Sequence, residues 1–320
     1  MTMAADRHPD ASDPSDRALQ ERADRRRLAG TQPAFDLEAL HRERARWAEV
    51  AAWLGPPAGV ALEHATVPGG PAVTFVVPTG ARRDRVVTYL HPGGYVQGSL
   101  EIGVHNAARF ARAAGLVLCA VGYRRAPEHV FPAALDDALA TQQWLLAEGF
   151  APDGIGLLGE SAGGGLALAT LVAMRDRGIA MPAVAALVSP WADLTGTASG
   201  QGRGVGDDPA LADAELTPYA RWYAGTASTD DPLISPVRAS LRGLPPLLVA
   251  YGEFEMLASD SERTIANARR DGITCEVFVG HGADHCFTTL AETDIEARRG
   301  VDAVADWLVG HLVSDADNLS

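Results

Sequence analysis

The sequence predicts an α/β protein with a mostly parallel central sheet, helices on both faces of the sheet and a helical cap. From Val86 onward, short apolar runs that each fit one buried strand alternate with longer runs of helical periodicity. Strands separated by helices of this length favour a parallel sheet that is covered on both faces. The segment Trp191–Thr229 interrupts the alternation and contains no predicted strand. An insertion near strand ends is typical of a lid, so we assign it to the cap.

The first elements precede this alternation. Residues 1–30 are polar and charged, and we expect a disordered or loosely ordered arm there. Apolar residues at spacings of three and four then predict a helix over Asp36–Leu54, which Gly55 and two prolines end. The segment 61–77 is strand-like, and the turn Pro68–Pro71 divides it into two antiparallel strands.

The remaining strands are predicted from short, largely apolar runs that are separated by helices. These strands are Val86–Leu90, Leu116–Val121, Ile155–Leu158, Val184–Val188, Leu247–Tyr251 and Glu276–Val279. The accompanying helices are Val104–Ala114, Pro132–Glu148, Leu166–Met174, Leu216–Tyr223, Leu257–Arg270 and Ile295–Leu312. We therefore assign residues 61–190 and 230–320 to the core, and residues 31–60 and 191–229 to the helical cap.

Composition excludes several classes of function. The chain has 320 residues, which is enough to bury a large core, and 47% of them are hydrophobic. A formal net charge of −14 argues against nucleic-acid binding, which needs basic patches. The chain contains arginine but no lysine. The absence of lysine excludes Schiff-base chemistry and a phosphate-binding loop of the Walker type.

The sparse cysteines predict a reducing compartment. Cys119, Cys275 and Cys286 are odd in number and lack metal-ligand spacing. The first residues lack an apolar signal segment, and no apolar run approaches the length of a membrane span. We therefore expect a cytoplasmic protein that contacts no membrane and no nucleic acid, with a homodimer as one option for its assembly.

One turn carries the strongest chemical signal. Gly159–Gly163 fits G-x-S-x-G between a predicted strand and a predicted helix, which is the context of a nucleophile elbow. The glycines lack the Cβ atoms that would obstruct such a sharp turn. The following helix directs its free N–H groups and the positive end of its dipole at the serine. We interpret Ser161 as a nucleophile.

A serine nucleophile needs a base and a carboxylate that orients the base. In this architecture the chain order is serine, acid, histidine. His281 and His285 both follow the last predicted strand and are candidates for the base. Together with Asp284 they resemble a metal-binding spacing, but Gly282 favours a loop, so we expect no metal site.

The acid is expected on the loop after the preceding strand. Glu255 is the first candidate there, Glu253 the second and Asp260 the third, because Asp260 falls inside a predicted helix. Such carboxylates also occur simply as helix-start charges.

The oxyanion hole is expected at His91-Pro92-Gly93-Gly94, which ends a strand well before the elbow. Its glycines would let backbone N–H groups approach a substrate, and the N–H of Ala162 would complete the set. The alternative is an ordinary turn, because Pro-Gly-Gly is a common turn sequence.

Several motifs occur in order between Val86 and Phe287. They are HPGGY at His91, YRRAPEHVFPAALDDAL from Tyr123, GESAGGGLAL from Gly159, SPWADLT from Ser189, DPLISP from Asp231, GEFEML from Gly252 and DHCF from Asp284. With these motifs the chain resembles the hormone-sensitive-lipase-like branch of the α/β-hydrolases, the bacterial family IV esterases. The resemblance implies an α/β-hydrolase fold, a cap from the N-terminal residues and the later insertion, and no metal or cofactor. It also implies a triad of Ser161, Glu255 and His285, with oxyanion donors from Gly93, Gly94 and Ala162.

The chain departs from the family pattern at three positions. Pro92 stands in a motif that the family usually writes HGGG. Glu255 stands where the usual acid is Asp, and Glu160 stands where Asp is commoner.

The resemblance implies a carboxylesterase that cleaves small to medium esters through an acyl-enzyme. A lactone is an alternative substrate. A dehydratase or lyase, or a non-enzymatic receptor, is disfavoured because Ser161 and His285 are both present. We expect four aromatic residues to line the substrate pocket, namely Tyr95, Trp191, Tyr223 and Phe287.

Overall fold

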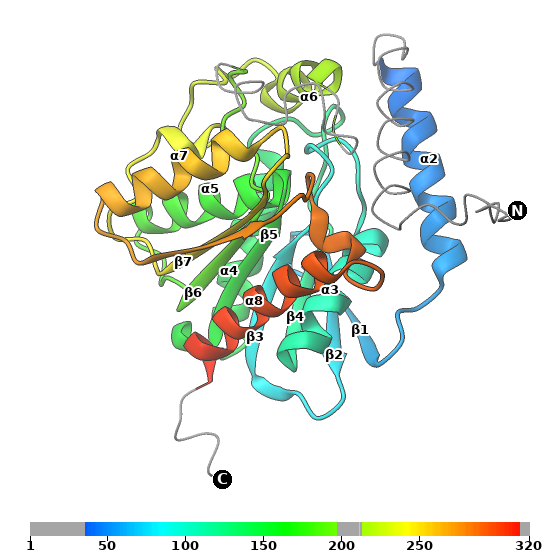
Figure 1. The fold of residues 1–320 in the computed structure, drawn as a ribbon, viewed down its shortest axis with the longest axis vertical. Coiled ribbons are helices and arrows are strands. Elements are labelled where there is room, and N and C mark those ends of the chain that lie inside the picture. Colours follow the sequence, from blue (N-terminus) through cyan, green and yellow to red (C-terminus); the bar gives the residue numbers. More distant parts are fainter. Residues whose placement is uncertain (1–35, 197–210, 212, 314–320) are drawn as a thin grey trace, which may run out of the picture.

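The computed structural model describes residues 36–196, 211 and 213–313. Within these residues lies an eight-stranded sheet in the order β1-β2-β4-β3-β5-β6-β7-β8 (Figure 1). The strands are β1 (Val60–Thr66), β2 (Ala72–Pro78), β3 (Arg82–Leu90), β4 (Leu116–Val121), β5 (Ile155–Glu160), β6 (Val184–Val188), β7 (Leu247–Gly252) and β8 (Cys275–Gly280). β2 pairs antiparallel with β1 and β4, and the other neighbours are parallel. The predicted α/β class with a mostly parallel sheet is confirmed.

Helices cover both faces of the sheet. They are α2 (Leu37–Leu54), α3 (Leu100–Ala114), α4 (Ala133–Ala147), α5 (Ala162–Asp176), α6 (Asp213–Ala224), α7 (Ala258–Arg270) and α8 (Ile295–Leu312). One apolar cluster joins α4, α5 and α7 to one face, and a second joins α3 and α8 to the other. Leu157 belongs to the first cluster and its neighbour Leu158 to the second, as the alternation of a strand requires. None of the helices that the structure describes is long and apolar enough to cross a lipid bilayer.

Three helices begin earlier than predicted, among them α6, which begins at Asp213 rather than Leu216. α3 begins at Leu100 rather than Val104, because the hydroxyl of Ser99 caps it by accepting from the Ile102 N–H at 3.4 Å. α5 begins at Ala162, directly after the elbow serine. Its first turn is rich in glycine, which weakens the helical signal in the sequence.

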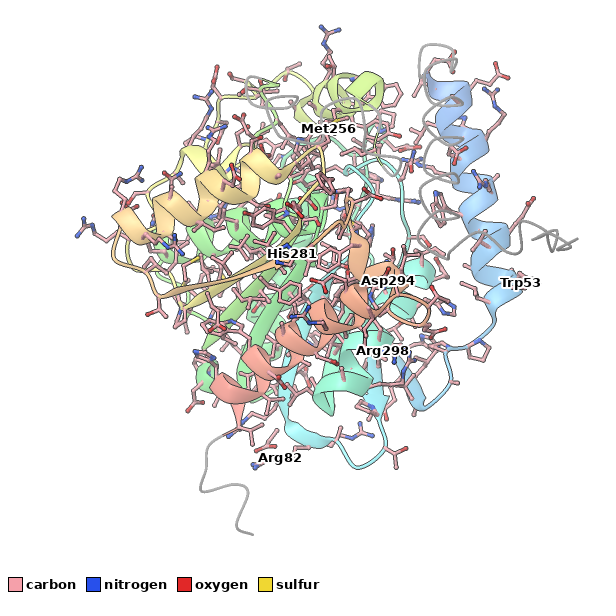
Figure 2. The ribbon with its side chains drawn as sticks, viewed as in Figure 1. Trp53, Arg82, Met256, His281, Asp294 and Arg298 are labelled. Atoms are coloured by element: carbon pink, nitrogen blue, oxygen red, sulfur yellow. The ribbon has the colours of Figure 1, made fainter. Side chains whose placement is uncertain are left out.

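α2 and α6 come from the two segments predicted as cap, and both contribute side chains to one cavity. Arg44 of α2 is anchored to the core, because its Nε donates to the Val96 carbonyl at 2.7 Å and its Nη1 to Glu128 at 2.6 Å. The predicted apolar stripe of α2 is only partly covered, since Trp53 is 84% exposed and points outward (Figure 2). The division into arm, cap and core stays a prediction, because residues 1–30 and 197–210 lie outside the described residues.

The packing of α5 against the sheet depends on glycines. A Cβ on Gly159 would lie 2.0 Å from the Gly163 carbonyl oxygen, and one on Gly163 would lie 2.1 Å from the Leu90 carbonyl oxygen. A Cβ on Gly165, one turn into the helix, would lie 2.0 Å from the Trp191 carbonyl oxygen. These neighbours are backbone atoms, so no side chain can move aside to make room.

We expect two glycine substitutions inside helices to act in opposite directions. Gly165→Ala should lower the free energy of unfolding by about 3 kcal/mol, because the new methyl group overpacks against backbone. Gly310→Ala in α8 should raise it by about 0.5 kcal/mol, because no atom lies within 4 Å of its added Cβ and alanine favours a helix. Urea unfolding followed by circular dichroism measures both. Wild-type stability for Gly165→Ala would contradict the close approach of α5 to the Trp191 backbone.

Candidate active site

Ser161 lies at the turn between β5 and α5 in a backbone conformation that serine rarely adopts. Its φ is 55° and its ψ is −120°. The turn is held because the Ser161 N–H donates to the Val188 carbonyl at 2.9 Å, and the Ser161 carbonyl accepts from Gly164 and Gly165 in α5. The residue is 6% exposed and its hydroxyl lies at the wall of the cavity. Strain of this kind is concentrated at functional sites.

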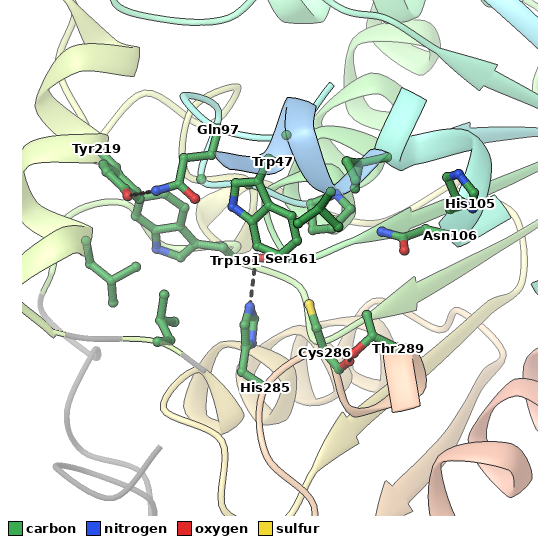
Figure 3. Close-up of a pocket in the computed structure, with 18 of the residues that line it drawn as sticks. Trp47, Gln97, His105, Asn106, Ser161, Trp191, Tyr219, His285, Cys286 and Thr289 are labelled. Carbon is green, nitrogen blue, oxygen red and sulfur yellow. Dashed lines mark hydrogen bonds between the residues drawn. The ribbon is translucent and has the colours of Figure 1, made fainter. Parts of the chain in front are cut away.

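His285 meets the serine from the loop after β8. Its Nε2 lies 2.8 Å from the Ser161 Oγ (Figure 3). If the hydroxyl donates to Nε2, the neutral ring holds its proton on Nδ1. Burial lowers the pKa of His285 to about 4, and the negative charge of Glu160 acts in the opposite direction. The ring is therefore neutral at pH 7 and able to accept a proton.

Glu255 is the carboxylate beside His285. The residue is completely buried, and its Oε2 lies 3.8 Å from His285 Nδ1, slightly beyond hydrogen-bond distance. The same oxygen accepts from the Ser189 hydroxyl at 2.5 Å and from the Gly252 N–H at 3.0 Å. The Ser189 Oγ in turn accepts from the Cys286 N–H at 3.2 Å. Ser189 therefore links the acid loop to the histidine loop.

The other two candidate acids lie elsewhere. Glu253 is partly exposed, accepts from the Gly282 N–H at 3.2 Å and lies 3.6 Å from His281 Nδ1. Asp260 is buried and accepts from the N–H groups of Ala192 and Asp193 at 2.9 and 2.8 Å. Burial raises the pKa of Asp260 to about 7. The structure thus brings Glu255 to His285 and gives Glu253 and Asp260 other partners.

The loop after β3 reaches the cavity beside Ser161. Three consecutive residues of this loop adopt positive φ, with values of 127° for Gly93, 61° for Gly94 and 64° for Tyr95. Gly93 and Gly94 line the cavity, as does Pro92. A Cβ on Gly94 would lie 2.4 Å from the Tyr219 ring. Ala162 follows the serine as the first residue of α5, where a helix has free N–H groups.

The cavity has a volume of about 340 Å³ and is lined by residues of α2, α3 and α6, by Ser161 and by the loops after β3 and β8. Trp47, Val50 and Leu54 of α2 form part of its wall, and Leu216 and Tyr219 of α6 form another part. The histidine loop contributes Cys286 and Thr289. Among the described residues no cluster of three or more His, Cys, Asp or Glu side chains is placed to hold a metal ion.

Only one of the four aromatic residues expected in the pocket lines this cavity, namely Trp191. Tyr95 and Tyr223 are buried behind it, with their rings stacked at 3.7 Å between centroids. Phe287 belongs to the opposite apolar cluster and stacks on Phe278 at 6.1 Å. The sequence could not show which of these side chains line the cavity, because aromatic residues near a motif serve packing as well as binding.

A buried ionic network behind the nucleophile was not expected from the sequence. The carboxylate of Glu160 is completely buried and accepts hydrogen bonds from Tyr89, from Arg109 and, at 2.7 Å, from the Thr288 hydroxyl. The Nη2 of Arg109 lies 2.5 and 2.7 Å from the two carboxylate oxygens. Thr288 lies in the same loop as His285, so the network connects the nucleophile strand to the histidine loop.

Comparisons with known proteins agree with this geometry. The family model of the alpha/beta hydrolase fold matches residues 87–289. An acetyl-hydrolase of Streptomyces hygroscopicus is 40% identical over 211 residues, which cover 65% of this chain and 68% of the relative. An ethyl acetate hydrolase of Pseudomonas putida is 31% identical over 234 residues, which cover 70% of this chain and 72% of the relative. A solved esterase from the bacterial hormone-sensitive lipase family has a TM-score of 0.85 at 31% identity and covers 94% of this chain and 99% of its own.

We expect Glu160 to affect the proton affinity of His285. Glu160→Gln removes a negative charge that favours the imidazolium, so the pKa of His285 should fall further. A fluorophosphonate reacts with an activated serine only while the histidine is neutral. The pH profile of its reaction rate should therefore move to lower pH in the variant.

The matched control is Glu253→Gln, which removes a carboxylate that pairs with His281 instead. Its profile should coincide with that of the wild type, with circular dichroism confirming that both variants are folded. A shift of the Glu160→Gln profile to higher pH would contradict the assignment.

Proposed function

We propose that this chain is a serine carboxylesterase that acts on small to medium esters through an acyl-enzyme. The premise is that the chain belongs to the α/β-hydrolase fold family and to its bacterial hormone-sensitive-lipase branch. The observation that carries the proposal is the 2.8 Å contact between the Ser161 Oγ and the His285 Nε2 at the wall of the cavity. The acetyl-hydrolase and ethyl acetate hydrolase names of two relatives support an ester as substrate.

In the first half-reaction the Ser161 oxygen attacks the ester carbonyl carbon while His285 Nε2 takes the hydroxyl proton. The carbonyl oxygen becomes an oxyanion, for which the N–H groups of Gly93, Gly94 and Ala162 are the proposed donors. When the intermediate collapses, the bond to the alcohol oxygen breaks. His285 gives its proton to that oxygen, and the alcohol leaves.

In the second half-reaction a water molecule attacks the acyl-enzyme carbonyl and passes a proton to His285. Collapse returns this proton to the Ser161 oxygen and releases the carboxylic acid. Glu255 is the proposed orienting acid, because its buried charge favours the imidazolium that forms in both halves. Its 3.8 Å separation from Nδ1 would shorten as the imidazolium forms.

The cavity is consistent with small and medium substrates. Its volume of about 340 Å³ lies at the low end of ligand pockets, and its wall is largely apolar. A lactone is an intramolecular ester, and the same steps would open its ring, so a lactone remains the alternative substrate. The three thiols Cys119, Cys275 and Cys286 are free, which supports the proposed cytoplasmic location.

The triad makes a quantitative prediction. Ser161→Ala or His285→Ala should lower kcat for a short para-nitrophenyl ester by about 10⁵- to 10⁶-fold, and the double variant should lose little more. Glu255→Gln should cost about 10³- to 10⁴-fold, because the residue acts through His285. Glu253→Gln is the control and should stay near wild type. An inactive Glu253→Gln beside an active Glu255→Gln would reverse the assignment of the acid.

The oxyanion loop makes a second prediction. Gly94→Ala should lower kcat by about 10²- to 10³-fold, because the methyl group would clash with the Tyr219 ring and displace a donor. Pro92→Gly should change kcat by less than about tenfold, because proline has no N–H to lose. Both are measured on one short-chain ester, with circular dichroism as the folding control. A folded Pro92→Gly that gains several hundredfold would show that the native loop is unsuited to ester hydrolysis.

A further inference from the structure

The cavity has polar groups on two sides of Ser161, and they differ in their hydrogen bonding (Figure 3). On one side the Gln97 amide donates to the Tyr219 hydroxyl, so these two groups are bonded to each other. On the other side lie His105 and Asn106 of α3 and Thr289 of the histidine loop. Apart from Ser161 and His285, most of the remaining wall is apolar, so these polar groups are the candidates for recognising polar atoms of a substrate.

The amide of Asn106 has a defined orientation. The Nη1 of Arg109 donates to the Asn106 Oδ1 at 2.9 Å. A guanidinium has only donors, so the amide oxygen must face Arg109 and the NH₂ group must face away from it. Figure 3 shows the nitrogen of Asn106 on the side of the cavity.

Arg109 is itself held rigidly. Its side chain is 10% exposed, and its Nη2 is shared between the two oxygens of the buried Glu160 carboxylate. This charge-assisted contact of Nη2 and the bond from Nη1 to Asn106 together restrain the guanidinium. The amide of Asn106 is therefore positioned by a chain of contacts that begins at the residue preceding the nucleophile. A donor that is positioned before binding loses little freedom when a ligand arrives.

The NH₂ group of Asn106 has no acceptor among the residues that the structure describes, although its side chain is partly buried in the cavity wall. The neighbouring Thr289 hydroxyl donates to the Cys286 carbonyl at 2.9 Å, so its proton is already used. An alkyl chain placed against Asn106 would displace water from the NH₂ group without replacing the lost hydrogen bond. An acceptor oxygen at the same place would replace it.

We propose that Asn106 is a specificity-determining residue that donates a hydrogen bond to a second acceptor oxygen of the substrate. The preferred substrates are then esters that carry an ether, keto or ester oxygen a few bonds from the scissile carbonyl, rather than simple alkyl esters. This inference rests on the proposed esterase function and names the substrate class of the same site.

The test compares pairs of esters of nearly equal size. In the acyl pair, para-nitrophenyl β-methoxypropanoate differs from para-nitrophenyl pentanoate by an oxygen in place of one methylene. In the alcohol pair, methoxyethyl acetate differs from butyl acetate in the same way. Each kcat/KM is divided by the rate constant for hydrolysis of the same ester by hydroxide without enzyme. This division corrects for the difference in intrinsic reactivity between the two esters of a pair. The corrected ratio within a pair is the oxygen preference.

We expect the wild type to prefer the oxygen-bearing ester of one pair by about twofold to tenfold, the range of one neutral hydrogen bond. Asn106→Leu removes the donor and keeps the approximate size, so this preference should fall to about one while pentanoate or butyl ester hydrolysis persists. Gln97→Met is the matched control on the opposite side of the cavity. Its oxygen preference should equal that of the wild type, whatever its effect on kcat.

The pair that shows the effect assigns Asn106 to the acyl or to the alcohol side, and either result supports the proposal. Equal corrected rates within both pairs in the wild type would overturn it. So would a preference that survives in Asn106→Leu, or one that disappears equally in Gln97→Met. If the wild type hydrolyses none of the four esters, the proposed function fails instead, and the two failures are thereby distinguished.

Discussion

The structure depends above all on the sharp turn at Ser161. Its positive φ places the hydroxyl above the sheet and starts α5 in the next residue. The turn is sterically allowed only because β5 and α5 approach each other through glycines, with a Cβ on Gly159 only 2.0 Å from the Gly163 carbonyl oxygen. The cost of such a conformation is on the order of 1–3 kcal/mol, and the surrounding buried strands must supply it. A flexible loop could not hold the serine in this position.

Buried carboxylates organise the loops around this turn. Glu160 reaches one side of the histidine loop through Thr288, and Glu255 reaches its other side through Ser189. Both carboxylates are completely buried, and each accepts several hydrogen bonds, which offsets much of the desolvation cost of a buried charge. The negative charge of Glu160 also opposes the effect of burial on the pKa of His285. Glu160 therefore both supports the histidine loop and raises the proton affinity of the base.

Helices α2 and α6 and the hydrogen-bond network of Glu160 meet at the cavity. Arg44 anchors α2 to backbone carbonyls of the core, while Tyr219 of α6 covers Gly94 of the loop after β3. Asn106, which contributes to another part of the wall, is instead held by a hydrogen bond from Arg109, and Arg109 is held by Glu160. The cavity is thus bounded by α2, by α6 and by the wall that Asn106 contributes from α3. A positioned donor in a cavity wall discriminates between ligands, because a ligand without an acceptor leaves that donor without a hydrogen bond.

The sequence by itself determined the order of strands and helices, most of their bounds and the elbow at Ser161, because apolar periodicity and glycine spacing are local properties of the chain. It also supplied His285 and Glu255 as candidates through short motifs. Only the tertiary structure decided that Ser189 joins these loops, that Arg109 orients Asn106, and that Tyr95, Tyr223 and Phe287 are packing residues outside the cavity wall. These facts depend on contacts between residues far apart in the chain, and local pattern carries no information about which distant partner a polar or aromatic side chain meets.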